Sequence, residues 1–275
     1  MYESYWRLER NPFDDDTELR GYFPSETHQA ALLKLRYVIE HGKGAAMVGG
    51  ATGVGKSFLL QVLSRQWAES YGPFAHLVFP QMSAAELLAF LAVELGAEGH
   101  YAGSEHAGLD RTVRAIEQRL RQLNTEGRQP VIIVDEAHLI EDWQVFQALR
   151  LLLNFQQAGG CRFSLIFSGQ NELFTTIRRM GQLEERLAVK CQLRPLSLDE
   201  TVGYISCRLE AAGADRPIFA PDALEPLHEL SGGVPRRINR LCDLALLVGF
   251  ADESKSISAR QVEAVAEEMY AVVPD

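Results

Sequence analysis

A glycine-rich segment, Gly49–Ser57, has the residue types and spacing of a phosphate-binding loop. From Gly50 it matches the pattern G-x-x-x-x-G-K-[ST]. Glycines let the backbone wrap closely around phosphate oxygens, because a Cβ would collide there or would disfavour a positive φ. N–H groups that turn inward, together with the start of the next helix, form an anion-binding nest. The residues predicted to bind nucleotide are Gly50, Ala51, Thr52, Gly53, Val54, Gly55, Lys56, Ser57 and Phe58.

Lys56 and Ser57 are predicted to have the most direct roles in this loop. The Lys56 ammonium can reach the β- and γ-phosphates of ATP, and the Ser57 hydroxyl can ligate Mg²⁺. A short apolar stretch, 45–49, precedes the loop, and a helix-like stretch follows from Phe58. This strand–loop–helix order favours a nucleotide site over the alternative, a glycine-rich turn that contains Lys-Ser by chance.

Two carboxylates, Asp135 and Glu136, follow the apolar segment Val131–Val134. Asp135, at the end of a predicted strand, is expected to hold Mg²⁺ mostly through water, because Mg²⁺ keeps several of its waters. Glu136 is expected to orient or deprotonate the water that attacks the γ-phosphate. The alternative is an acidic helix start after an ordinary buried strand, where carboxylates suit the helix dipole.

Asp135–His138 reads Asp-Glu-Ala-His, the tetrapeptide of one helicase class. Those enzymes carry two tandem core domains, whereas the second part of this chain is predicted to be small and helical. We therefore expect His138 to be a structural or polar-network residue rather than a catalytic one.

A further predicted strand, 163–168, also ends in polar side chains. A polar group there can reach the γ-phosphate from the side opposite Lys56. Gln170 is the preferred candidate, and Ser168 and Asn171 remain open, as does a plain turn followed by a helix cap.

Two arginines, Arg186 and Arg236, are candidates for contact with the nucleotide phosphates. Arg186 precedes the last predicted strand, where a lone arginine is otherwise a solvated surface residue. A cation that reaches the charge developing on the γ-phosphate is worth ~10³–10⁵ in rate. Arg236 opens a helix together with Arg237 and Arg240, and cations at this positive helix end favour an anionic partner over a plain surface role.

The order of predicted elements gives an α/β fold, in which short apolar strands alternate with amphipathic helices. This pattern indicates a three-layer α/β/α P-loop core with a five-stranded parallel sheet. The strands are expected at 45–49, 74–79, 131–134, 163–167 and 189–193, with helices at 27–41, 83–95, 109–124 and 141–157 and a polar loop at 96–108. After Pro195 only helices are expected, at 198–212, 221–230, 235–250 and 258–271. We therefore predict an ATPase core over 1–194 and a small all-helical lid domain over 195–275.

Composition narrows the class of protein. Of the 275 residues, 47% are hydrophobic and 23% are charged. The sequence has no apolar run long enough for a membrane span and no secretory signal pattern at its start, so a cytoplasmic protein is expected. Four scattered cysteines argue against a disulfide framework or a metal site. The net charge of −10 disfavours a dedicated DNA-binding protein, although four basic residues are able to cluster: Arg178, Arg179, Lys190 and Arg194.

These motifs in this order resemble the AAA+ ATPases, and more closely the ATPase domain of ExeA-type general secretion proteins. Pilus-biogenesis ATPases and TniB-type transposition ATPases are related to that family. The resemblance extends from about Tyr5 to Tyr270. The segments that carry it are Tyr5–Phe13, Tyr22–His28, Gly50–Ser57, Val131–His138, Ser168–Leu173 and Gly233–Asn239.

The resemblance implies roles and partners. Arg186 would be an arginine finger that acts on a neighbouring subunit, Gln170 the sensor-1 residue and Arg236 the sensor-2 residue. Homo-oligomers, as rings or filaments with ATP between subunits, are implied as well. ExeA itself continues into a membrane span and a peptidoglycan-binding domain, whereas this sequence ends at Asp275. We therefore expect either the ATPase portion alone or a stand-alone paralogue.

The expected function is Mg²⁺-dependent ATP hydrolysis that drives assembly or remodelling of a secretion or pilus complex. One alternative is an ATP-dependent DNA-binding adaptor of the transposition kind, in which ATP acts as an assembly switch. A second is a nucleotide-binding switch with negligible hydrolysis.

Overall fold

The protein is described by a computed structural model that covers residues 1–14, 21–97 and 108–271. Most of the loop expected at 96–108 lies outside these residues. Contacts within the chain define two compact units. The α/β unit comprises Thr27–Ala51 and Lys56–Leu193. The helical unit comprises Met1–Glu26, Thr52–Gly55 and Arg194–Asp275.

The α/β unit is built on a five-stranded sheet in which every neighbouring pair of strands is parallel. The strand order is β2-β3-β4-β1-β5, so the strand that enters the phosphate-binding loop, β1, lies between β4 and β5. The strands are β1 (Gly44–Gly49), β2 (Phe74–Leu77), β3 (Val131–Val134), β4 (Ser164–Gly169) and β5 (Leu187–Gln192). The predicted five-stranded parallel sheet is confirmed. Strand β2 is shorter than predicted, because Val78 and Phe79 leave the sheet and are exposed.

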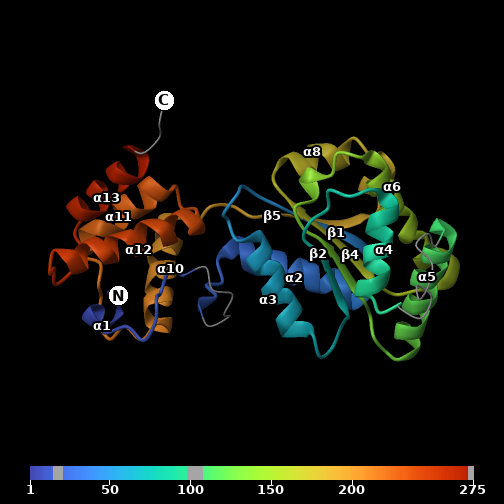
Figure 1. Cartoon of the computed structure of the whole chain (residues 1–275), viewed down its shortest axis with the longest axis horizontal. Helices are drawn as coiled ribbons and strands as arrows, with labels where there is room; N and C mark the ends of the chain where they lie inside the picture. Colours follow the sequence, from blue (N-terminus) through green and yellow to red (C-terminus); the bar gives the residue numbers. More distant parts are fainter. Residues whose placement is uncertain (15–20, 98–107, 272–275) are drawn as a thin grey trace. The chain divides into compact units, whose positions relative to one another are not determined.

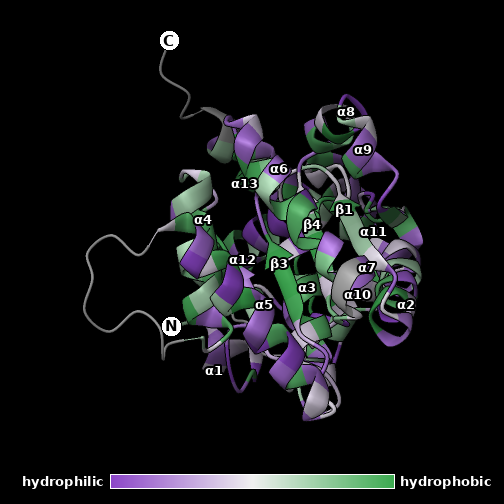
Figure 2. Ribbon diagram, turned by 90° about the vertical axis from the view of Figure 1, so that its right-hand side faces the viewer, coloured by the Kyte–Doolittle hydropathy of each residue, from purple (hydrophilic) through white to green (hydrophobic). Residues whose placement is uncertain are grey.

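Helices cover both faces of this sheet, which explains why its central strands are apolar on both sides. All residues of β1, β3 and β4 are buried. Figure 2 shows α4 and α5 on one side of these hydrophobic strands and α2 and α3 on the other. The helices are α2 (Glu26–His41), α3 (Lys56–Trp67), α4 (Ala84–Glu94), α5 (Leu109–Thr125) and α6 (Trp143–Leu152). The chain path through both units can be followed in Figure 1.

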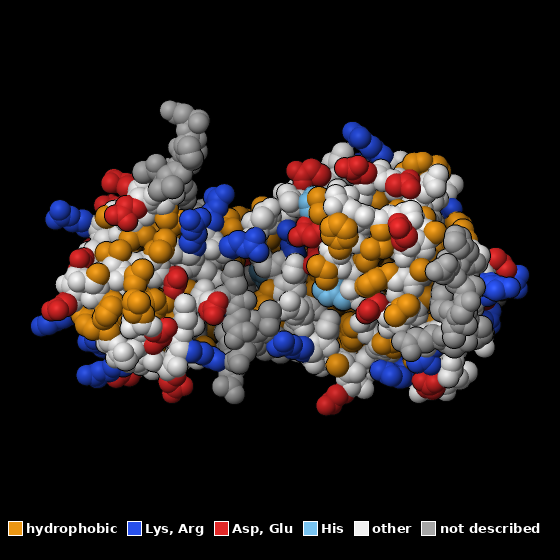
Figure 3. Space-filling view, viewed as in Figure 1, with side chains coloured by type: hydrophobic (Ala, Val, Ile, Leu, Met, Phe, Trp, Pro, Cys, Tyr) orange, Lys and Arg blue, Asp and Glu red, His pale blue; other side chains and the backbone are white. Residues whose placement is uncertain are grey.

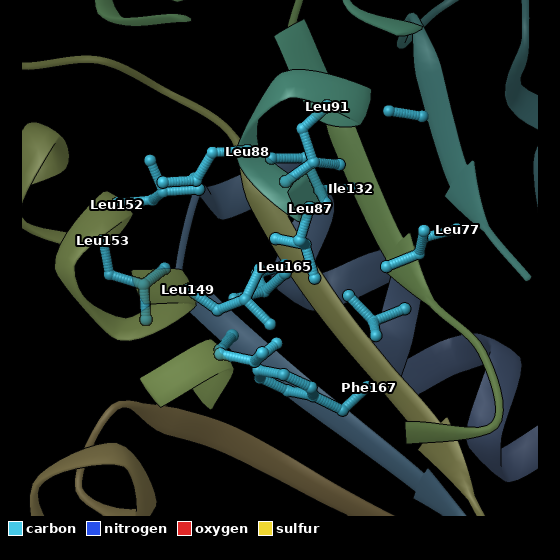
Figure 4. Packing of buried hydrophobic residues seen from close by; sticks show 14 of the residues in the cluster. Leu77, Leu87, Leu88, Leu91, Ile132, Leu149, Leu152, Leu153, Leu165 and Phe167 are labelled. Atoms are coloured by element: carbon cyan, nitrogen blue, oxygen red, sulfur yellow. The ribbon is translucent and has the colours of Figure 1, made fainter. Parts of the chain in front are cut away.

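Leucines of α4 and α6 form the core against one face of the sheet. Leu87 and Leu91 of α4 point toward the strands, beside side chains of β2, β3 and β4 (Figure 4). Their exposed fraction is 0%. The predicted capping box of α4 is confirmed, since Ser83 Oγ accepts the Glu86 N–H and the Glu86 side chain accepts the Ser83 N–H.

Two segments of the α/β unit differ from the prediction. The single helix expected at 141–157 is two helices, α6 and α7 (Asn154–Gly159). In α7 the Gln156 side chain donates to the Phe163 carbonyl at 2.7 Å, which ties this turn to the start of β4. Two short helices between β4 and β5, α8 (Glu172–Arg178) and α9 (Gly181–Glu184), were not predicted.

The helical unit contains the four helices predicted after Pro195, namely α10 (Leu198–Ala211), α11 (Pro221–Ser231), α12 (Pro235–Ala251) and α13 (Ala259–Ala271). It also contains Met1–Glu26, which the prediction had placed with residues 27–194. The Trp6 side chain, on α1 (Glu3–Trp6), is 1% exposed, and its Nε1 donates to the Leu246 carbonyl at 3.0 Å. The predicted limit at 194/195 stays a prediction. Within the described residues, no helix combines the length and the apolar character that crossing a bilayer requires.

Candidate functional site

The phosphate-binding loop connects β1 to α3, as its pattern predicts. Gly53 and Gly55 have φ values of 82° and 94°, which other residues rarely adopt. Lys56 begins α3 and is 6% exposed. Its Nζ donates to the carbonyls of Gly50 and Ala51, each at 3.0 Å. The loop's own backbone thus holds the ammonium group at the carboxyl end of β1.

Gly49 has a role that the sequence reading did not identify. A Cβ on Gly49 would lie 2.0 Å from Cε2 of Phe174, a residue of α8. Only glycine lets this ring pack on the end of β1, directly before the loop. The sequence contained a signal, since Gly49 extends the glycine-rich stretch by one residue beyond the pattern.

Asp135 directly follows β3 and is a buried carboxylate. Its side chain is nearly inaccessible, and its N–H donates to the Leu77 carbonyl at 2.8 Å. Burial acts to raise its pKa, but the polar groups of His76, Ser57 and Ser168 that face it, with the Glu136 N–H, outweigh burial and lower the pKa to about 2. The structure therefore brings Asp135 and Ser57 together, as predicted for a pair that would hold Mg²⁺.

His76 is a second residue that the sequence reading missed. It lies on β2, and its Nε2 is 3.8 Å from Asp135 Oδ2. This distance exceeds hydrogen-bond length, so the structure shows a polar contact between the two side chains and not a hydrogen bond. The sequence offered one hint, because His76 lies within a short predicted strand. The pairing of β2 with β3, which brings His76 next to Asp135, could not be predicted from the sequence.

Glu136 follows Asp135 in a left-handed backbone conformation, with a φ of 49°. Its N–H donates to Asp135 Oδ1 at 2.9 Å. The Glu136 side chain is partly exposed, and its Oε2 lies 3.3 Å from Nδ1 of His138. The structure thus places His138 in a polar contact with the predicted catalytic carboxylate.

The three candidates for contact with the γ-phosphate occupy different positions at the end of β4. Ser168 is fully buried within the strand, beside Asp135. Gln170 directly follows Gly169, whose carbonyl accepts the Gly50 N–H of the loop at 3.3 Å. Asn171 is exposed and makes no side-chain cap to α8. Gln170 therefore lies next to the start of the loop, and its role as sensor stays a prediction.

Arg186 lies at the amino end of the strands, whereas the loop of its own chain follows their carboxyl end. It directly precedes β5, whose Leu187 pairs with Ala45 at the start of β1, whereas Gly49 pairs with Gln192. The intervening length of parallel strand is about 16 Å at ~3.3 Å per residue. The Arg186 Nη2 donates to two neutral amide oxygens of α7, Asn154 Oδ1 and Gln157 Oε1, each at 3.2 Å. These bonds orient the guanidinium without neutralising its charge.

Arg236 is the second residue of α12 in the helical unit, where its side chain is exposed. Its N–H donates at 3.2 Å to the carbonyl of Gly53, a loop residue that groups with this unit. Just before it, Gly233 has a φ of 67°, and a Cβ there would lie 2.1 Å from the Leu196 carbonyl oxygen. This close approach explains the glycine in the Gly-Val-Pro-Arg segment and fixes where α12 begins.

The basic residues that were candidates for a DNA-binding cluster gain no support as a group. Lys190 is paired with Glu184. On the surface of the α/β unit that Figure 3 shows, acidic and basic side chains are interspersed.

Comparisons with known proteins agree with this architecture. A family model described as an AAA domain matches residues 39–177. General secretion pathway protein A of Aeromonas hydrophila is 32% identical over 272 residues, which are 98% of this chain and 48% of that protein. The chain therefore spans about half the length of this curated relative.

Solved structures extend the likeness to most of the chain. The ORC2 protein of Aeropyrum pernix gives a TM-score of 0.71 at 17% identity, covering 97% of this chain and 73% of that one. The RuvB Holliday junction branch migration motor of Thermotoga maritima gives 0.59 at 16% identity, covering 93% and 73%. At such identities the likeness concerns the fold alone.

Proposed function

The chain belongs to the AAA domain family, and on this premise we propose that it binds ATP with Mg²⁺ and hydrolyses it. The observation that carries the proposal is the cluster of Lys56, Ser57 and Asp135 at the carboxyl ends of β1 and β3. A lysine ammonium, a hydroxyl and a buried carboxylate that stays ionised are the groups that a nucleotide phosphate and its cation require.

Mg²⁺ would be held by Ser57 directly and by Asp135 mostly through water. The low pKa of Asp135 supports this assignment, because the carboxylate is charged at neutral pH although it is buried. A cation held there would supply positive charge to the phosphate oxygens of the nucleotide. Lys56 adds a second cation on the loop side, while the loop N–H groups bind the phosphates. Together these groups stabilise the charge that develops during in-line transfer to water.

Glu136 would orient the attacking water and accept its proton. The test is Glu136→Gln, with Glu141→Gln as a matched control, since Glu141 is an exposed glutamate five residues away that makes no polar contact within the described residues. We expect Glu136→Gln to bind ATP like the unsubstituted protein and to lose turnover by about 10²-fold or more. Near-normal turnover by Glu136→Gln would remove this residue from the mechanism.

Arg186 would act on the nucleotide of a neighbouring subunit in a ring or filament. Its place supports this proposal, since Arg186 precedes the amino end of β5, about 16 Å of strand away from the end that adjoins the loop of its own chain. The test mixes Arg186→Ala with Glu136→Gln, each of which is expected to be inactive alone. Turnover should return in the mixture, because one interface then combines an intact Arg186 with an intact Glu136. A mixture as inactive as its components contradicts action between subunits.

The process that ATP turnover serves is proposed from the relative in Aeromonas hydrophila, whose name places it in the general secretion pathway. We propose assembly or remodelling of a secretion or pilus complex, in the cytoplasm. Turnover measured with and without duplex DNA over a salt series tests this against a DNA-binding adaptor, because phosphate contacts give a steep salt dependence. DNA-stimulated turnover that is lost at high salt would favour the adaptor.

A further inference from the structure

The backbone of Glu136 is fixed, whereas its carboxylate needs a further support. A φ of 49° is uncommon for a residue with a side chain, and strained residues of this kind gather at functional sites. The hydrogen bond from the Glu136 N–H to Asp135 Oδ1 holds the backbone. The side chain beyond it has three rotatable bonds and is 38% exposed. Backbone geometry alone therefore leaves the direction of the carboxylate open.

His138 is placed to set that direction. It lies on a single 3₁₀ turn, Ala137–Leu139, and its side chain is 11% exposed. Its Nδ1 is buried and makes no hydrogen bond within the described residues, yet Glu136 Oε2 is only 3.3 Å away. Leaving a buried nitrogen without a hydrogen-bond partner is energetically unfavourable. A small rotation of either side chain would align this pair and remove that cost.

The imidazole is itself held by the end of β4. A Cβ on Gly169 would lie 3.1 Å from the His138 amide nitrogen and 3.2 Å from its Nδ1, so the ring packs where glycine leaves room. The Gly169 carbonyl accepts the Gly50 N–H, the first N–H of the phosphate-binding loop. His138 is thus packed between the strand that supports the loop and the carboxylate of Glu136.

We propose that His138 is a positioning residue for Glu136, an inference that rests on the proposed ATPase function. The Nδ1–H of a neutral imidazole donates to Oε2 and fixes the carboxylate, which leaves Oε1 to accept from the attacking water. The histidine exchanges no proton with substrate and touches none of the reacting atoms. This arrangement is a base oriented by a third group, the same logic that other hydrolytic sites use.

Three variants separate this role from simple packing. His138→Asn keeps an N–H donor close to the position of Nδ1, His138→Phe keeps the ring volume without a donor, and His138→Ala removes both. We expect kcat to fall about tenfold in the Ala and Phe variants, the loss of one oriented hydrogen bond, with KM for ATP unchanged. The Asn variant should stay within about threefold of the unsubstituted protein. Circular dichroism of each variant verifies the fold.

A second background shows whether His138 acts through Glu136. In Glu136→Ala, the further change His138→Ala should leave the residual turnover unaltered, because the group that His138 positions is gone. Any of three results would overturn the proposal. The first is a His138→Phe variant as active as the unsubstituted protein, and the second is a His138→Asn variant as impaired as His138→Ala. The third is a loss of turnover on His138→Ala that is as large in the Glu136→Ala background as in the unsubstituted protein. Turnover that depends on Glu136 but not on His138 overturns this proposal alone. Absence of turnover in the unsubstituted protein overturns the ATPase function as well.

Discussion

Gly232 and Gly233 form a matched pair in which backbone strain and crowding can be separated. Both have positive φ, 61° and 67°. A Cβ on Gly232 would meet nothing within 4 Å, whereas a Cβ on Gly233 would lie 2.1 Å from the carbonyl oxygen of Leu196. That oxygen belongs to the backbone, so rotation of a side chain cannot relieve the overlap. Alanine at the two positions should therefore have very different effects on the stability of the helical unit.

The magnitudes follow from these contacts. Gly232→Ala carries only the left-handed backbone penalty, about 1 kcal/mol. Gly233→Ala carries the same penalty and must also move Leu196 by more than an ångström, at a cost of about 1–3 kcal/mol. The movement strains the hydrogen bond from the Leu196 N–H to the Gly233 carbonyl, now 2.8 Å, which adds about 1 kcal/mol. The free energy of unfolding should fall by about 3–5 kcal/mol, against about 1 for the control.

Urea unfolding followed by circular dichroism measures both variants, and hydrogen exchange of the α12 amides localises the effect to the helical unit. Exchange in β1 and β4 should be unchanged, because these strands belong to the α/β unit. Equal destabilisation by the two substitutions would refute the reasoning, since it would show that the close approach of Gly233 to Leu196 yields without cost.

Three further predictions concern the α/β unit. Gly49→Ala should lower the free energy of unfolding of this unit by about 1–3 kcal/mol, but should lower it little further in a Phe174→Ala background. Urea unfolding of the two single variants and the double variant measures this. If the losses of the two single variants simply add in the double variant, the prediction is refuted. The pKa of Asp135 is lowered from 3.8 to about 2, so its charged form contributes roughly 2 kcal/mol of folding stability above about pH 4, which is lost as the pH falls toward 2. The free energy of unfolding of Asp135→Asn should therefore lie below that of the unsubstituted protein at neutral pH, by a difference that shrinks in acid. A difference that stays constant with pH contradicts this prediction. Arg186→Ala should lower the melting temperature by no more than about 3 °C, because it loses only bonds to neutral amides on a part-exposed side chain, and a larger drop in a thermal melt would indicate a structural role.

Local patterns explain why much of the fold was predictable. The order of β1, the loop and α3 is written in adjacent residues, and the apolar run Val131–Val134 ends at the first polar residue, as β3 does. The capping box of α4 requires only Ser83 and Glu86, three residues apart. Each of these features depends on interactions within a few residues, so one sequence suffices to find them.

The features that were missed depend on contacts between distant residues. The need for glycine at position 49 is set by Phe174, and the place of His76 beside Asp135 is set by the pairing of β2 with β3. The left-handed conformation of Glu136 has no counterpart in its residue type, because glutamate has no preference for it. The sequence thus predicted most residues of the candidate site, whereas the contacts that hold them in place were visible only in the tertiary structure.

The packing of Trp6 among α12 residues has a consequence for the order in which the protein can fold during synthesis. Residues 1–26 leave the ribosome well before the helices of their own unit, which begin after Arg194. At ~5–20 residues per second, the interval is on the order of ten seconds or more. During that time the strands of the α/β unit emerge one after another, while the aromatic residues of the N-terminal segment have no native partner. We expect a chaperone to bind this segment on nascent chains, and variants that make Trp6 polar to misfold after release rather than during translation.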